Sequence, residues 1–190
     1  GGESEACGNG TRCVADLISK EKGKKNIILN TLSGNLKSLI LENNLVTTEI
    51  GSAKTKWNEI PLSEELNTLN LNIKINDINN NEHFGGTAIS VGNPHVIFFV
   101  DKIENFDIEK IGPQIENHKI FPEKCNVTIA KVIDKNLIKV KVWERGAGLT
   151  KACGTAACAT AYAGKLNDLT NNNTDIEFET GKLSIFIDEK

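Results

Sequence analysis

Residues 151–156 read Lys-Ala-Cys-Gly-Thr-Ala and residues 5–10 read Glu-Ala-Cys-Gly-Asn-Gly, so one Ala-Cys-Gly string stands near each end of the chain. Each string opens a segment with helical periodicity and has a second cysteine shortly inside it, Cys13 and Cys158. The second segment is rich in alanine, which is typical of a helix that is packed closely on all sides. We infer two related halves, each with a cysteine at a helix N-terminus; a chance match of three residues is the alternative.

Outward from these strings, the pattern predicts many strands and few helices. Helices are predicted over residues 7–20 and 153–165, and a third begins at Asp107, which can cap it. Strands are predicted over residues 26–32, 36–42, 46–50, 69–75, 87–91, 95–100, 126–132, 137–144, 175–179 and 183–187. This irregular order indicates a mixed α+β fold. The polar stretch around Trp57 is predicted to join a domain at 1–51 to a domain at 52–190.

The composition is that of a globular protein and excludes several classes of function. The 190 residues are 39% hydrophobic and 25% charged, which excludes disordered and fibrous proteins. The longest apolar run, residues 96–100, is much shorter than the roughly 20 residues of a membrane-spanning helix. No secretory leader is recognisable. A net charge of −3 and a pI near 5.7 argue against nucleic-acid binding. We expect a cytoplasmic protein without membrane or nucleic-acid partners.

The five cysteines are not spaced like a zinc site or a disulfide framework. No Cys-x2-Cys pair occurs and the three histidines lack finger spacing, so we expect reduced thiols and no bound metal. A helix N-terminus stabilises a thiolate, and adjacent glycines expose N–H groups to an anion. If the two halves face one another, Cys7 and Cys153 can remove a proton from one face of a carbon and deliver one to the other. Cys13, Cys125 and Cys158 are predicted to serve packing.

Four ordered motifs in the chain resemble those of the diaminopimelate epimerase family. They are Ser-Glu-Ala-Cys-Gly-Asn-Gly-Thr-Arg-Cys at 4–13, Gly-Asn-Pro-His at 92–95, Trp-Glu-Arg-Gly-Ala-Gly at 143–148 and Lys-Ala-Cys-Gly-Thr-Ala-Ala-Cys-Ala at 151–159. Residues 121–127 also fit that family's Phe-Pro-x-x-x-Asn-Val pattern. The resemblance covers essentially the whole chain. It departs from the family at Ala6 and Ala156, where most members have Met and Gly, and neither change removes a reacting group.

The resemblance implies a cofactor-independent enzyme that interconverts LL- and meso-diaminopimelate in lysine and peptidoglycan precursor biosynthesis, acting as a homodimer. It implies two similar α+β domains, each a mixed sheet curled around a central helix, with the site in the cleft between them. It also implies that the chain lacks the N-terminal part of the first domain and the extreme C-terminus.

Carried over residue by residue, the resemblance assigns Cys7 and Cys153 as the acid/base pair and His95 and Glu144 as the residues that tune their pKa. The substrate-binding positions that it assigns are Gly8, Asn9, Asn93, Asn126, Glu144, Arg145, Gly154 and Thr155. On its own chemistry, Arg145 suits a carboxylate held by two parallel hydrogen bonds. By themselves, His95 and Glu144 would also fit a core histidine and a strand cap. Arg12 is assigned no contact.

Three other hypotheses stay open on the sequence. Proline and hydroxyproline racemases share the logic of two cysteines, but their first motif usually reads Cys-Gly-His-Gly, where this chain has Asn9. A redox or metal-binding module is weakened by the missing Cys-x2-Cys spacing. The third hypothesis is that this chain, taken alone, is an inactive part of the epimerase.

Overall fold

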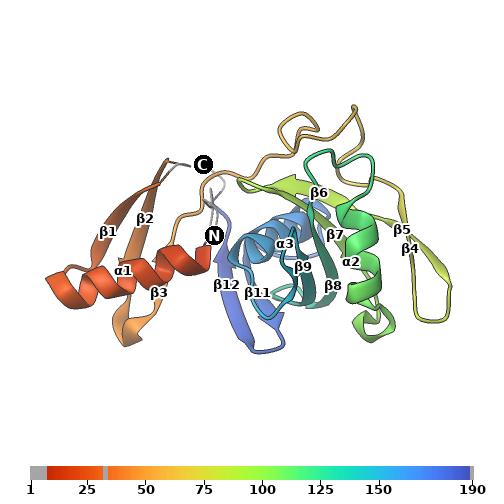
Figure 1. Ribbon diagram of the computed structural model, residues 1–190. Helices are drawn as coiled ribbons and strands as arrows, with labels where there is room; N and C mark the ends of the chain where they lie inside the picture. The colour runs from red at the N-terminus through yellow and green to blue at the C-terminus, as the bar shows by residue number, and fades with distance from the viewer. Residues whose placement is uncertain (1–7, 32–33, 189–190) are drawn as a thin grey trace. The chain divides into compact units, whose positions relative to one another are not determined.

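The computed structural model describes residues 8–31 and 34–188, and the chain divides into two compact units, residues 1–52 and 53–190. Each unit has its own sheet and its own buried core (Figure 1). Within the described ranges, no helix is long and apolar enough to cross a membrane. The mixture of curled sheet and few helices confirms the predicted α+β class.

The first unit packs one helix on a small antiparallel sheet. Helix α1 (Gly8–Lys22) precedes three strands, which lie in the sheet in the order β1-β2-β3. A short 3₁₀ turn, η1, connects β2 to β3. Their bounds are β1 Asn26–Thr31, β2 Gly34–Ile40, η1 Glu42–Asn44 and β3 Val46–Thr48. The buried core of this unit is Ala15 of α1 with Ile27 and Ile40 of the sheet.

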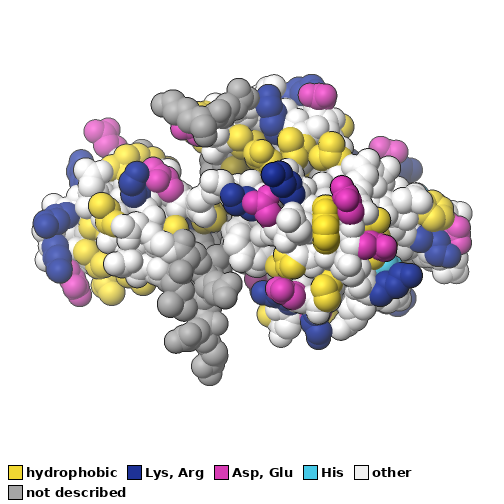
Figure 2. All heavy atoms as spheres, turned by 90° about the horizontal axis from the view of Figure 1, so that it is seen from above, with side chains coloured by type: hydrophobic (Ala, Val, Ile, Leu, Met, Phe, Trp, Pro, Cys, Tyr) yellow, Lys and Arg dark blue, Asp and Glu magenta, His cyan; other side chains and the backbone are white. Residues whose placement is uncertain are grey.

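The apolar residues of helix α1 are only partly covered by the sheet of the first unit. Ile18 packs against the small core, but Val14 is 45% exposed and Leu17 is 57% exposed. The reason is geometric, because the sheet covers the face that carries Thr11 and Ala15, while Val14 and Leu17 point elsewhere around the helix. Figure 2 shows hydrophobic side chains on the surface between lysines and acidic side chains.

The second unit is built on a seven-stranded mixed sheet. The strand order is β12-β11-β9-β8-β7-β6, and β10 pairs with β9. Two neighbouring pairs, β7 with β8 and β9 with β11, are parallel, and the others are antiparallel. The bounds are β6 Thr87–Ser90, β7 Pro94–Phe99, β8 Asn126–Asp134, β9 Leu137–Glu144, β10 Gly148–Thr150, β11 Asn173–Phe178 and β12 Gly181–Phe186.

Two helices lie against this sheet. Helix α3 (Gly154–Leu166) lies in the hollow of the curled sheet and contacts β6, β7, β8, β11 and β12 (Figure 1). A Cβ atom at Gly164 would lie 2.6 Å from Thr170 Oγ1, so small residues are what allow α3 to approach this closely. This confirms the predicted close packing of the alanine-rich helix. Helix α2 (Ile108–Glu116) follows the short 3₁₀ turn η2 (Ile103–Asn105) in the chain and contacts β8, β9 and β10.

Several predicted elements change their bounds, and some short elements were missed. The strand predicted at 69–75 is β4 (Ile73–Asn76), which forms a separate hairpin with an unpredicted strand, β5 (Glu82–Gly85). The turn between them contains Asp77, whose carboxylate accepts from two backbone N–H groups. The other elements missed are β10 and the turns η1 and η2. The strand predicted at 175–179 begins two residues earlier, at Asn173 of β11, which pairs with Phe186.

Candidate active site

The polar residues predicted for the second unit gather where four of its elements meet. The parallel strands β7 and β8 both begin here, with His95 opposite Asn126, and the antiparallel strand β9 ends here at Glu144. Helix α3 also begins here, directly after Cys153. The topology therefore brings together residues that lie far apart in the sequence.

Cys153 is the N-cap of helix α3 and is 5% exposed. Its sulfur accepts a hydrogen bond from the backbone N–H of Ala156 at 3.5 Å and lies 3.4 Å from Thr155 Oγ1. Burial raises the pKa of Cys153 to about 11; the contacts with Thr155 and Ala156 lower that pKa, and the Glu144 carboxylate raises it. The thiol is therefore protonated at neutral pH in this state.

The first turn of helix α3 adds a place for an anion. Gly154 and Thr155 are both buried there. The first N–H groups of a helix have no partner within the helix, and the helix dipole places positive charge at the same end. A substrate carboxylate next to Cys153 would therefore meet favourable backbone donors.

His95 is completely buried at the start of strand β7. Its Nε2 lies 2.9 Å from Asn93 Oδ1, and because that oxygen can only accept, Nε2 carries the proton. Burial lowers the pKa of His95 to about 3, and the charge of Arg145 acts in the same direction. The ring is therefore neutral in the folded protein, and Asn93 fixes its tautomer.

Asn126 joins strand β7 to the turn that follows strand β9. Its amide nitrogen donates to the Pro94 carbonyl at 2.9 Å, and its Oδ1 accepts from the backbone N–H of Arg145 at 2.9 Å. Both ends of this buried amide thus have protein partners. Arg145 also donates from Nη1 to the Glu123 carbonyl at 2.9 Å, and its exposed guanidinium keeps further N–H groups for a ligand.

The predicted site residues of the first unit stand at the start of helix α1. Gly8 and Asn9 form its first turn, and Arg12 donates to Asn9 Oδ1 at 2.6 Å. Arg12, which was assigned no contact, therefore orients a residue predicted to bind substrate. Cys7 lies outside the described residues. Among the described residues, Cys13, Cys125 and Cys153 are free thiols.

One residue next to this site was missed by the sequence analysis. Glu116, the last residue of helix α2, is buried and its carboxylate bonds to the turn that carries Glu144 and Arg145. The one sequence signal was Gly112 a helical turn earlier, because a glycine inside an apolar helical pattern indicates close packing. No group of three or more potential metal ligands occurs among the described side chains.

Comparison with known proteins agrees with this arrangement. The model of the family described as "Diaminopimelate epimerase" matches residues 87–190. The chain is 69% identical over 190 residues to the diaminopimelate epimerase of Pelagibacter ubique (strain HTCC1062), covering all of this chain and 69% of that protein. It is 43% identical over 187 residues to that of Afipia carboxidovorans, covering 97% of this chain and 64% of that protein.

Among solved structures, a hydroxyproline epimerase from Agrobacterium vitis matches with a TM-score of 0.64 at 12% identity, covering 95% of this chain and 57% of that chain. At this identity, the likeness is one of fold. The chain spans about two thirds of the length of the curated relatives that it matches.

Proposed function

Because the chain belongs to the diaminopimelate epimerase family, we propose that the protein containing it interconverts LL- and meso-2,6-diaminopimelate without a cofactor. The observation that carries the proposal is Cys153, a buried thiol at the N-terminus of helix α3 whose pKa responds to the Glu144 carboxylate. The geometry suits proton transfer at a carbon that bears a carboxylate, because the Cys153 thiol lies next to the backbone N–H groups at the start of helix α3.

The proposed reaction uses one cysteine on each face of the α-carbon. A thiolate takes the α-proton, and the electron pair of the broken C–H bond stays on the carbon as a carbanion. The opposite thiol then gives its proton to that carbon and becomes a thiolate, so configuration is inverted and the total number of protons is unchanged. We assign these roles to Cys7 and Cys153, which exchange them in the reverse direction. The protonated Cys153 described above suits the step in which it acts as the acid.

The remaining site residues receive roles that agree with their chemistry. The N–H groups of Gly154 and Thr155, and of Gly8 and Asn9 in the other half, suit the carboxylate at the reacting centre. The guanidinium of Arg145 suits the distal carboxylate of a long dicarboxylate substrate.

The other predicted positions surround these groups. Asn93 and the neutral His95 support the site from strand β7, with His95 and Glu144 tuning the thiols. Asn126 is assigned to the substrate site as well, where it also holds the Arg145 backbone.

The proposal extends to the pathway, the compartment and the assembly of the protein. The protein acts in lysine and peptidoglycan precursor biosynthesis, it works in the cytoplasm, and it forms a homodimer. The units at 1–52 and 53–190 correspond in this view to parts of two related domains, each contributing one cysteine. The two diaminopimelate epimerases that the chain resembles in sequence support the reaction, and the resemblance of the motifs supports the rest.

The test uses the reduced full-length protein with LL-diaminopimelate in D₂O. We expect deuterium to enter at one α-carbon, followed by NMR, together with formation of the meso isomer. Proline serves as the control substrate, because the solved hydroxyproline epimerase shares the fold. Exchange with proline alone would move the protein to the racemases. No exchange with either substrate, in folded and reduced protein, would refute the proposal. The same assay on the 190-residue chain tests whether it is active alone.

A further inference from the structure

The buried carboxylate of Glu116 holds the turn that carries two of the proposed site residues. The turn follows strand β9 and runs through Glu144 and Arg145 to Gly146. One oxygen of Glu116, Oε2, accepts from Trp143 Nε1 at 2.7 Å, and the other, Oε1, accepts from the backbone N–H of Gly146 at 3.1 Å. The two donors flank Glu144 and Arg145 in the sequence, so a single carboxylate binds the turn on both sides of these two residues.

The environment makes these two bonds strong and specific. The Glu116 side chain is 7% exposed, and its cation neighbour, Lys124, stands at 3.9 Å with half of its own side chain exposed. Hydrogen bonds to an ionised acceptor are stronger than neutral ones, and burial strengthens them further. Both contacts need an acceptor, which a carboxylate offers on both oxygens and an amide on only one.

Helix α2 fixes the position of this carboxylate by packing directly on Trp143. A Cβ atom at Gly112 would lie 2.4 Å from Trp143 Cγ, so the absence of a side chain lets the indole rest against the helix backbone. Gly112 and Glu116 are one helical turn apart and therefore face the same way. The ring is held by contact at Gly112 and by its N–H at Glu116.

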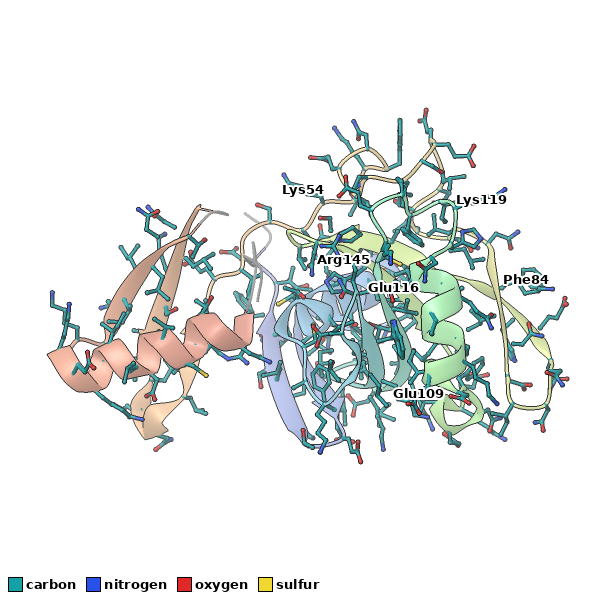
Figure 3. The ribbon with its side chains drawn as sticks, in the orientation of Figure 1. Lys54, Phe84, Glu109, Glu116, Lys119 and Arg145 are labelled. Atoms are coloured by element: carbon teal, nitrogen blue, oxygen red, sulfur yellow. The ribbon has the colours of Figure 1, made fainter. Side chains whose placement is uncertain are left out.

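We propose that Glu116 is a positioning residue for the epimerase reaction, fixing Glu144 beside Cys153 and Arg145 beside the substrate. This role rests on the function proposed above. The turn has two further named anchors, the bond from the Arg145 backbone N–H to Asn126 and the bond from Arg145 Nη1 to the Glu123 carbonyl, so Glu116 supplies two of four named hydrogen bonds. In Figure 3, Glu116 and Arg145 lie at the same end of α2, and Glu109 lies at the other end.

The test compares Glu116→Gln with the wild type in the full-length protein. The amide has the same shape as the carboxylate but turns an NH₂ group toward one of the two donors, so that one bond is lost. We expect kcat/KM for diaminopimelate to fall about tenfold or more, mostly as a rise in KM because Arg145 is displaced. In ¹⁵N NMR spectra, the indole N–H signal of Trp143 or the amide signal of Gly146 should shift.

Two further variants separate positioning from a loss of stability. Glu109→Gln removes a charge from an exposed position on the same helix and should leave kcat/KM unchanged. Trp143→Phe keeps a ring against Gly112 but removes the indole donor. In the Trp143→Phe background, the amide that Glu116→Gln introduces faces only the Gly146 N–H donor. The substitution at position 116 should therefore lower kcat/KM much less than it does in the wild type.

The loss of kcat/KM on Glu116→Gln, compared between the wild-type and Trp143→Phe backgrounds, tests the positioning role. A smaller loss in the Trp143→Phe background would support the positioning role, whereas equal losses in both backgrounds would contradict it. Glu116→Gln protein that melts earlier but keeps the wild-type kcat/KM would show a purely structural role and overturn the proposal. Absence of diaminopimelate turnover in the wild type would refute the proposed function and this role together. Turnover that persists unchanged in Glu116→Gln would refute this role alone.

Discussion

At the scale of single residues, the site in the second unit holds its two main titratable groups uncharged. Burial raises the pKa of Cys153 to about 11 and lowers that of His95 to about 3, so both groups are neutral at pH 7. The cause is the same in both, because removal from water disfavours whichever form is charged. A protonated thiol is the form that gives a proton to a carbanion.

The first prediction concerns the thiol itself. Cys153→Ser should lower epimerisation by about 10²-fold or more, since a serine hydroxyl is a much weaker acid than a thiol. Folding should be preserved, because serine is among the preferred N-cap residues and can cap helix α3 in the same position. Turnover of LL-diaminopimelate and circular dichroism would measure the two effects.

The matched control for that variant is Cys13→Ser, since Cys13 is an exposed thiol on helix α1. It should keep wild-type turnover. Cys7→Ser should behave like Cys153→Ser if the two thiols form one acid/base pair. Near-normal turnover in Cys7→Ser or in Cys153→Ser would contradict the two-base mechanism.

The second prediction concerns the buried histidine and pH. His95 stays neutral in the folded protein down to about pH 3, whereas in the unfolded chain it takes up a proton below its ordinary pKa of 6.5. Between these values the unfolded state binds one more proton than the folded state. This group therefore lowers the free energy of unfolding by about 1.4 kcal/mol for each unit by which the pH is lowered. The contribution is complete above pH 6.5 and is lost as the pH falls toward 3.

His95→Gln removes this proton uptake. Urea unfolding at several pH values between about 6.5 and 4 should therefore show a shallower loss of stability in the variant, by about 1.4 kcal/mol per pH unit. His118, whose pKa burial also lowers, is present in both proteins and cancels in the comparison. Parallel curves for the two proteins would mean that His95 is protonated in the folded state.

At the scale of elements, the sequence predicted the parts whose pattern is local. The helix expected at 153–165 is α3 (Gly154–Leu166), and the strand expected at 137–144 is β9 (Leu137–Glu144). The hairpin strand β5 and the short strand β10 were missed because neither has a run of alternating apolar residues. Glu116 was missed for a different reason: its partners come from a turn 27 and 30 residues later, which only the packing of α2 on β9 brings near.

The candidate site was predicted through motifs, and what motifs omit is the set of hydrogen bonds between them. Asn126 was expected to touch substrate, but no motif indicated that its amide bridges Pro94 and the Arg145 backbone. That bridge depends on β8 lying between β7 and β9, with His95 opposite Asn126. Strand order is a long-range property, so it could not be predicted from local periodicity.

The third prediction concerns the contact between helix α2 and strand β9. Gly112→Ala places a methyl group 2.4 Å from Trp143 Cγ, so the helix or the indole must move. Overpacking of this kind costs about 1–3 kcal/mol of unfolding free energy. Thermal or urea unfolding measures it, and kcat/KM should fall as well because the turn after β9 shifts.

Gly85→Ala is the matched control, since a Cβ atom there meets nothing within 4 Å. It should leave the midpoint of unfolding nearly unchanged. Equal stability of the Gly112→Ala and Gly85→Ala proteins would contradict the close approach of the indole to the helix.

At the scale of the whole molecule, the two units differ in how much core they hold. Residues 53–190 enclose two hydrophobic clusters, one on each side of the sheet, while the described part of residues 1–52 has three buried core residues. Buried apolar area is the main source of stability, so the second unit has the means to fold by itself. It also contains Cys153, His95, Asn126, Glu144 and Arg145, but Cys7 belongs to the other unit.

The last prediction separates folding from catalysis. A fragment of residues 53–190 should unfold cooperatively in urea and give a dispersed ¹⁵N NMR spectrum, because its sheet, both helices and both clusters are intact. It should not epimerise diaminopimelate, since one thiol can serve only one face of the α-carbon. The full-length protein is the positive control for turnover. A folded fragment with wild-type turnover would show that Cys7 is dispensable, and a fragment without cooperative unfolding would show that the clusters of the second unit need residues outside it.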